Sequence, residues 1–248
     1  MNKNVWGIVA SENSESLTAL FDFLMIEYCR IFGIDTMTNE SCIIYNDTNA
    51  KFPTLIINRN PIQIRLAQSS LTYWAQTIFQ LSHELCHYAI RQHKADKNFT
   101  LSWFEEILCE AMSLYALQFA SQNWDQCKLF EYNPAFASAI DDYLKSELNK
   151  TGTAQLSNCA TIESLKEYET HLSGERETHR NERNTLYYAI SFRPDDCRFF
   201  CDYTKYLDEE NKITIDFSKW ENDDSCPVIK ELHKLQPCCN AVKEIVNA

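Results

Sequence analysis

The spacing of hydrophobic residues in the N-terminal part of the chain first follows a helical pattern and then a strand pattern. Apolar side chains at intervals of three and four follow serine and asparagine capping candidates, which predicts an amphipathic helix over residues 14–32. Short runs rich in β-branched residues then alternate with Asn-Asp, Phe-Pro and Asn-Pro turn signals, and they predict strands at 42–46, 54–58 and 62–67. The turn at 58–61 predicts a hairpin or a tight corner between the last two strands.

From Ser70 onward the pattern is mostly helical. One helix is expected from about Ser70 to His93 and a second over residues 101–122. Further helices are expected at 134–149, 160–172, 176–190, 194–207 and 228–246, with one extended piece at 212–217. With only four glycines and six prolines, the sequence contains few residues that would break such helices. The pattern therefore predicts an α+β protein with a helical C-terminal part, and the best boundary candidate is the stretch 150–158.

The composition is that of a folded, acidic protein. The chain has 248 residues, of which 45% are apolar and 12% aromatic, enough for one large domain or two small ones. A formal charge of −12 opposes nonspecific binding to nucleic acid or to an anionic membrane surface. No window reaches 18 uninterrupted apolar residues, and the first residues lack the apolar core of a signal peptide. We therefore expect neither nucleic acid nor a membrane as a partner.

The cysteines favour a reducing compartment. The sequence has eleven of them, an odd number scattered along the chain, and none forms the paired CxxC spacing of a structural zinc site. Several, such as Cys29, Cys86 and Cys109, lie within helical patterns, where a free cysteine behaves as a small hydrophobic residue. These features predict reduced thiols in a cytoplasmic protein. A secreted effector exported without a cleavable signal is the alternative.

Residues 80–88 read QLSHELCHY and form an HExxH motif, with His83 and His87 four positions apart and Glu84 directly after the first histidine. On a helix, positions four apart differ by only about 40°, so both imidazoles can reach one ion from successive turns. Neutral imidazole nitrogens bind Zn²⁺ at roughly 2.0–2.1 Å. Glu84 lies about 100° from His83 on the helix, beside the pair, where it can take a proton from an activated water. The motif therefore predicts two zinc ligands and a general base on one rigid element.

The residues that flank the motif separate this interpretation from an accidental match. An HExxH pattern arises by chance in a chain of this composition with a probability on the order of one in a hundred. The flanking positions are all uncharged: Leu81, Ser82, Leu85, Cys86, Tyr88 and Ala89. A solvent-facing helix would carry charged residues at several of these positions, so the helix is expected to be buried. Buried histidine and glutamate side chains need polar or metal partners, which favours the zinc interpretation.

His93 is the first candidate for a third ligand. It stands six residues after His87, where the metzincin pattern HExxHxxGxxH has its third histidine. That pattern needs a glycine for the chain to turn out of the helix, and this chain has Ile90 there, a β-branched residue poorly suited to such a turn. If the helix continues through Ile90, His93 points away from the other two histidines. His93 is therefore the less favoured candidate.

The second candidate lies on the next predicted helix. Eighteen residues separate His87 from Glu106, and Glu110 follows four positions later. Here the chain resembles the gluzincins, the thermolysin-like and aminopeptidase-like group of HExxH zinc peptidases, over roughly residues 54–120. The stretch WFEE (103–106) matches the Trp-x-x-Glu entry of the aminopeptidase branch, although the following glycine of that branch is replaced by Ile107.

This resemblance implies Glu106 as the third zinc ligand. It implies that Glu110, one turn later, hydrogen-bonds a ligating histidine. Glu110 is also the alternative ligand, because Glu-Ala at 110–111 resembles another small-peptidase arrangement of the same class. Glu105, next to Glu106, best fits an acidic residue in a solvated first turn.

The resemblance also implies a fold and an activity. The fold would be a zincin-like core in which a small N-terminal β-sheet packs on the active-site helix, with residues 1–150 as the catalytic domain and 151–248 as a mostly helical lobe. Strand 62–67 would be the edge strand that pairs with an extended substrate, or an ordinary sheet strand. Substrates would be peptides or proteins, cleaved with Zn²⁺ as cofactor and Glu84 as general base.

The sequence does not decide between several oxyanion donors, nor between a peptidase and its alternatives. The donor that stabilises the oxyanion could be any of several C-terminal residues, namely His171, His179, Tyr187, Tyr188, Tyr203 and Tyr206. The alternatives to a peptidase are a catalytically inactive or regulatory zincin-like zinc-binding module and, less favoured, a helical structural protein in which the motif is accidental.

Overall fold

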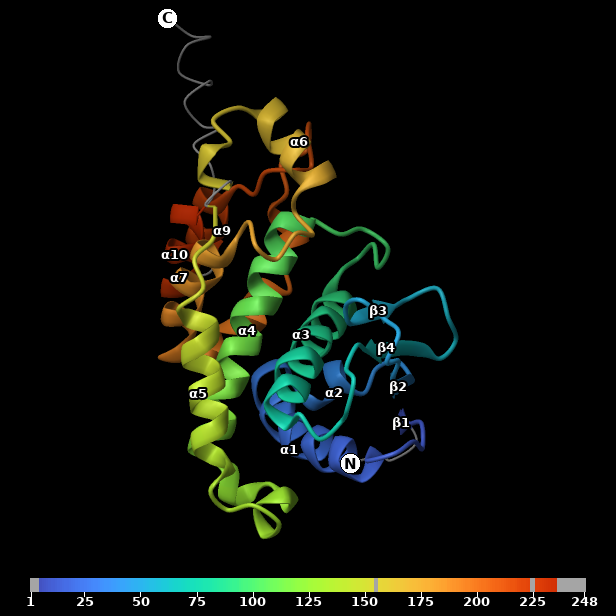
Figure 1. Ribbon diagram of the computed structural model, residues 1–248. Coiled ribbons are helices and arrows are strands. Elements are labelled where there is room, and N and C mark those ends of the chain that lie inside the picture. The colour runs from blue at the N-terminus through green and yellow to red at the C-terminus, as the bar shows by residue number, and fades with distance from the viewer. Residues whose placement is uncertain (1–4, 154–155, 224–225, 236–248) are drawn as a thin grey trace, which may run out of the picture. The chain divides into compact units, whose positions relative to one another are not determined.

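The computed structural model describes residues 5–153, 156–223 and 226–235 (Figure 1). The chain divides into two compact units. The first contains residues 1–93 and 112–149, and the second contains residues 94–111 and 150–248. The segment 94–111, which the sequence suggested would belong to the N-terminal part, is thus grouped with the C-terminal residues. The catalytic-domain and lobe assignments on either side of residue 150 stay predictions.

The first unit contains a four-stranded mixed sheet in the order β1-β2-β4-β3. The strands are β1 (Trp6–Ile8), β2 (Cys42–Asn46), β3 (Thr54–Ile56) and β4 (Ile62–Leu66). β1 and β4 run parallel to β2, and β3 returns antiparallel to β4. The three predicted strands and the turn between the last two are confirmed. Strand β1, which is only three residues long, is not predicted from the sequence.

The position of β4 decides between two expectations. Residues 62–67 could form either the edge of the sheet or an ordinary sheet strand, and the second holds: β4 pairs with β2 on one side and with β3 on the other, as Ile64 does with Ile44 and Leu55. The edges of the sheet are β1 and β3. Along β4, buried Ile62, Ile64 and Leu66 alternate with half-buried residues, as expected when one face of a strand is covered.

Helix α3 (Trp74–His93) covers this sheet and carries the HExxH motif. It contacts β3 and β4, and on another side it contacts α1 (Ser14–Phe32). Two hydroxyl groups fix the helix in place: Tyr28 donates to the carbonyl of Ser82 at 2.7 Å, and Tyr88 donates to the carbonyl of Glu40 at 2.7 Å. The predicted packing of a small sheet on the motif-bearing helix is present, and the α+β class is confirmed.

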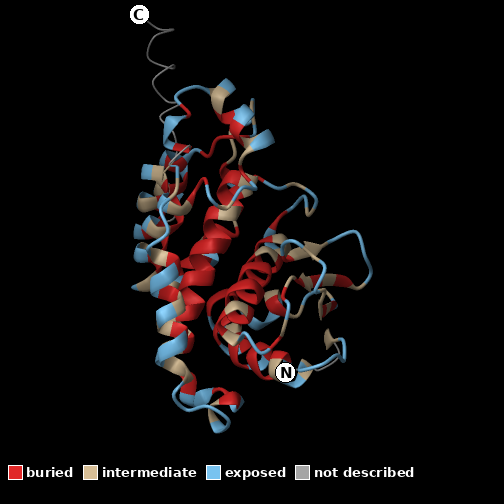
Figure 2. Cartoon of the chain, viewed as in Figure 1, coloured by how far each residue is buried: buried red, intermediate tan, exposed pale blue. Residues whose placement is uncertain are grey.

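The remaining elements of the first unit are helical. They are α2 (Ile34–Met37), the C-terminal part of α4 (Ser102–Gln122), the short 3-10 helices η1 (Trp124–Gln126) and η2 (Lys128–Glu131), and α5 (Phe136–Leu148). Figure 2 shows that α3 and α4 are buried along most of their length, whereas α5 keeps an exposed face. The high apolar content of α4 explains this, because only a helix that is covered on nearly all sides tolerates so few polar positions.

The second unit contains the first ten residues of α4 and a set of shorter helices. These are η3 (Leu156–Asn158), α6 (Ile162–His171), α7 (Arg180–Ser191), η4 (Pro194–Asp196), α8 (Cys197–Phe200), η5 (Tyr203–Tyr206), α9 (Phe217–Asp223) and α10 (Pro227–Leu235). Helix α6 begins with a capping box in which Thr161 and Ser164 satisfy each other's backbone groups. Helix α7 packs against α10.

Three C-terminal predictions need correction or restriction. The helix expected over 194–207 is wrong, because this stretch forms the short elements η4, α8 and η5. The extended piece expected over 212–217 is reduced to an isolated bridge between Leu207 and Ile215, and Phe217 already begins α9. The terminal helix is confirmed as α10 up to Leu235. The rest of that prediction, 236–246, lies outside the described residues.

Two predictions about the whole chain are tested in the described residues. No helix in these segments is long and apolar enough to cross a membrane. None of the nine cysteines in this part of the chain forms a disulfide, and most of them are buried, as expected for cysteines that pack as small hydrophobic residues.

Candidate metal centre

Helix α3 brings the two motif histidines together. The helix runs unbroken through Ile90 to His93, so the i, i+4 spacing places both imidazoles on one face. Their Nε2 atoms lie 3.1 Å apart. Two nitrogen ligands at roughly 2.05 Å from one tetrahedral ion would lie about 3.3 Å apart. The pair therefore already has close to the separation that a shared zinc ion requires.

Glu106 of α4 completes a group of three ligands. His83, His87 and Glu106 each offer one ligand atom, and these atoms all lie within 4.8 Å of one another. Among the described residues, this is the one group of three histidine, cysteine or acidic residues close enough to hold a metal ion. His83 is 2% exposed, while His87 and Glu106 are half-buried.

The donor set fits zinc. Two imidazole nitrogens and one carboxylate oxygen are typical of catalytic zinc sites, in which three protein ligands leave a fourth position for water or substrate. His87 and Glu106 are half-buried, so two of the three possible ligands keep some exposure to solvent.

Glu84 is a further residue of the motif on α3. It follows His83 directly in sequence and is only 2% exposed. The six uncharged residues around the motif are buried as well, which confirms the prediction that this helix does not face solvent. A buried carboxylate directly after the first histidine is the residue to which the HExxH motif gives the role of general base.

Glu110 has a different environment from the one the resemblance implied. Its carboxylate is fully buried and lies between two guanidinium groups: Arg183 Nη1 is 2.9 Å from Oε2, and Arg176 Nε is 3.4 Å from Oε1. A carboxylate held in this way serves as the counter-charge of a buried arginine, since Arg183 is itself 2% exposed. Glu106, and not Glu110, belongs to the group of possible ligands.

Glu105 and His93 also have clear positions. Glu105 was expected in a solvated turn, and this is wrong: it is 2% exposed, its carboxylate lies 2.6 Å from Lys94 Nζ, and it accepts a hydrogen bond from Tyr203. His93 ends α3 on the surface, with its Nε2 atom 3.0 Å from the hydroxyl of Thr36. This agrees with the expectation that His93 points away from the other two histidines when the helix continues.

The candidates for an oxyanion donor differ in their surroundings. Tyr203 is fully buried, and its hydroxyl donates to Glu105, so burial and the nearby carboxylate raise the pKa of this phenol. His179 is fully buried, with Nδ1 3.4 Å from the hydroxyl of Thr178. Tyr188 is 57% exposed. Tyr203 is thereby assigned to the support of Glu105, and none of the others is assigned as a donor.

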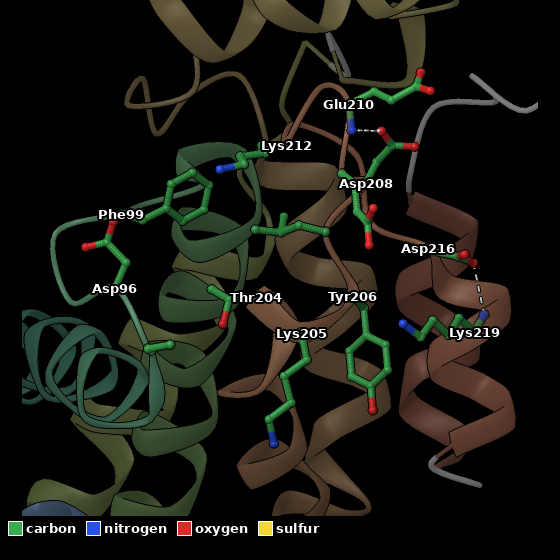
Figure 3. A pocket seen from close by; sticks show the side chains of 13 residues that line it. Asp96, Phe99, Thr204, Lys205, Tyr206, Asp208, Glu210, Lys212, Asp216 and Lys219 are labelled. Carbon is green, nitrogen blue, oxygen red and sulfur yellow. Dashed lines mark hydrogen bonds between the residues drawn. The ribbon is translucent and has the colours of Figure 1, made fainter.

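A separate hollow of about 710 Å³ lies in the second unit, and the group of possible ligands does not line it (Figure 3). Two of its carboxylates accept hydrogen bonds from nearby backbone amides: Asp208 accepts from the amide of Glu210 at 3.0 Å, and Asp216 accepts from the amide of Lys219 at 2.9 Å. These side chains stabilise the turns on which they lie. The hollow therefore has no evident role in the chemistry of the motif.

No protein-family model, curated protein or solved structure matches the chain.

Proposed function

We propose that the protein is a zinc-dependent metallopeptidase. The observation that carries this proposal is the group of His83, His87 and Glu106, in which the histidine Nε2 atoms lie 3.1 Å apart, with the buried Glu84 next to it in sequence. Two histidines and a carboxylate as ligands, together with a second carboxylate as base, are the parts that metal-assisted hydrolysis of a peptide bond needs.

Each residue has one task in this mechanism. A bound Zn²⁺ supplies Lewis acidity, which polarises the scissile carbonyl and makes water a better nucleophile near neutral pH. His83, His87 and Glu106 hold the ion. Glu84 takes the proton from the attacking water and delivers it to the nitrogen of the leaving amine, which departs as a neutral group.

Substitution of Glu84 tests the mechanism. Glu84→Gln keeps the ligands but removes the base, so we expect one zinc per chain and a loss of hydrolysis of about 100-fold or more. His83→Ala removes a ligand and should lose both zinc and activity. Glu167→Gln, a change at an exposed position of α6, is the matched control and should behave as wild type. Cleavage of a fluorogenic peptide library and zinc analysis provide the two readouts.

The results distinguish the proposed activity from its main alternative. Full hydrolytic activity in Glu84→Gln would contradict the mechanism. Zinc at one per chain in the wild type without cleavage of any library member would favour the catalytically inactive or regulatory zinc-binding module. The absence of zinc from the wild type would contradict both the peptidase and the zinc-binding module.

A further inference from the structure

The start of helix α4 is capped by a residue distant in sequence. An α-helix leaves its first backbone N–H groups without intrahelical partners. Before α4, Leu101 has no side chain that can accept a hydrogen bond. Instead, the carboxylate of Glu169, in α6, accepts from the amide of Ser102 at 2.7 Å through Oε1 and from the amide of Trp103 at 2.8 Å through Oε2.

This cap completes the hydrogen bonding of the first turn. The next two amides, of Phe104 and Glu105, donate to the carbonyl of Leu101 at 3.2 and 3.0 Å. The amide of Leu101 itself donates to the hydroxyl of Tyr203 at 3.2 Å. A carboxylate that bridges two amides at a helix N-terminus forms charge-assisted hydrogen bonds and interacts favourably with the helix dipole. Glu169 is therefore the acceptor that fixes where α4 begins.

Side chains of this first turn also fix how α4 is rotated about its own axis. The indole nitrogen of Trp103 donates to the carbonyl of Ile213 at 2.9 Å. On another side, Glu105 is held by Lys94 and Tyr203. With the start and the rotation of the helix both fixed, the next residue, Glu106, has a defined direction.

We propose that Glu169 is a positioning residue of the metal centre, which holds Glu106 in place by capping the first turn of α4. The proposal rests on the proposed function in one respect, namely that Glu106 is a metal ligand. Glu106 lies four residues after the first capped amide, so loss of the cap would let the turn that carries this ligand fray. Residues that orient metal ligands typically change metal affinity by 10- to 100-fold when replaced.

Zinc affinity of Glu169 variants tests this proposal. In Glu169→Ala we expect zinc affinity, measured by competition with a chromophoric chelator, to fall about 10- to 100-fold. Glu169→Gln keeps one acceptor oxygen and should lose less. The absorption spectrum of bound Co²⁺ reports the coordination directly and should change in Glu169→Ala, which a purely structural role would not require. Glu167→Gln, on the same helix but exposed, should leave affinity and spectrum unchanged.

Hydrogen exchange shows whether the cap itself is lost. The amides of Ser102 and Trp103 should exchange faster in both Glu169 variants than in Glu167→Gln. Wild-type zinc affinity and Co²⁺ spectrum in folded Glu169→Ala, or in Glu169→Gln if the alanine variant does not fold, would overturn the proposal and leave the proposed function intact. A wild-type protein that binds no zinc would instead overturn the proposed function, and this proposal with it.

Discussion

Two glutamates on one helix show how the surroundings of a residue assign its role. Glu106 and Glu110 are four positions apart on α4 and share one face of the helix. Glu106 is half-buried and lies with His83 and His87, whereas Glu110 is fully buried between Arg183 and Arg176. The same side chain thus belongs to a group of possible metal ligands in one place and is neutralised by two arginines in the other.

This difference predicts opposite effects of the same substitution. Glu106→Gln should lower zinc affinity, because it removes one of the three possible ligands. Glu110→Gln should leave Arg183 buried without its counter-charge, which costs about 3–5 kcal/mol in the free energy of unfolding. Urea unfolding with a chelator present, together with zinc titration, measures both. Loss of zinc in Glu110→Gln at unchanged stability would instead make Glu110 the ligand.

At the scale of single elements, the structure agrees best with the sequence where the pattern is local. The helix α1 and the strand β2 have the predicted bounds, because their periodicity is complete within the element. The predicted approach of the two histidines is also confirmed, because HExxH spacing on a helix is sufficient to bring two imidazoles together. Between Pro194 and Tyr206 the helical pattern is contradicted: this stretch forms short turns and not one helix.

Features that depend on residues distant in sequence could not be predicted. The order of strands places β4 inside the sheet, and no pattern within residues 62–67 encodes which strand will pair on its outer side. The acidic residues of α4 look alike in sequence, and their roles depend on Lys94, Arg183 and Tyr203. Glu169, which caps α4, lies more than 60 positions in sequence from the start of that helix.

The cap of helix α4 should make the free energy of unfolding depend on pH. Burial raises the pKa of Glu169 above its ordinary value of 4.5, and the amides of Ser102 and Trp103 lower it only in part. The folded protein therefore holds this proton more strongly than the unfolded chain does. As the pH rises from about 4.5 through the pKa of the folded state, this residue's contribution to the free energy of unfolding must fall.

Urea unfolding of the metal-free protein between pH 4 and 7 measures this contribution. We expect the stability of the wild type relative to Glu169→Gln to decrease with rising pH over that window. Glu167→Gln should run parallel to the wild type at every pH. A relative stability that increases with pH would mean that the two backbone hydrogen bonds outweigh burial.

At the scale of the whole molecule, a metal ion with ligands from α3 and α4 should stabilise the folded state. A ligand that binds only the native protein adds RT ln(1 + [L]/Kd) to the free energy of unfolding, about 2.7 kcal/mol at a concentration of 100 Kd. Zinc should therefore raise the Tm of the wild type in calorimetry. The Tm of His83→Ala should stay constant under the same titration, and an equal rise in both proteins would indicate that zinc binds elsewhere.

The zinc content of the purified protein decides whether His83, His87 and Glu106 hold a metal ion. Purification without chelators, followed by elemental analysis, should give one zinc per chain for the wild type and for His93→Ala, a control that changes a histidine on the same helix but outside the group. His83→Ala and His87→Ala should contain almost none. A wild-type protein that contains no zinc and takes up none on titration would contradict the proposed zinc site.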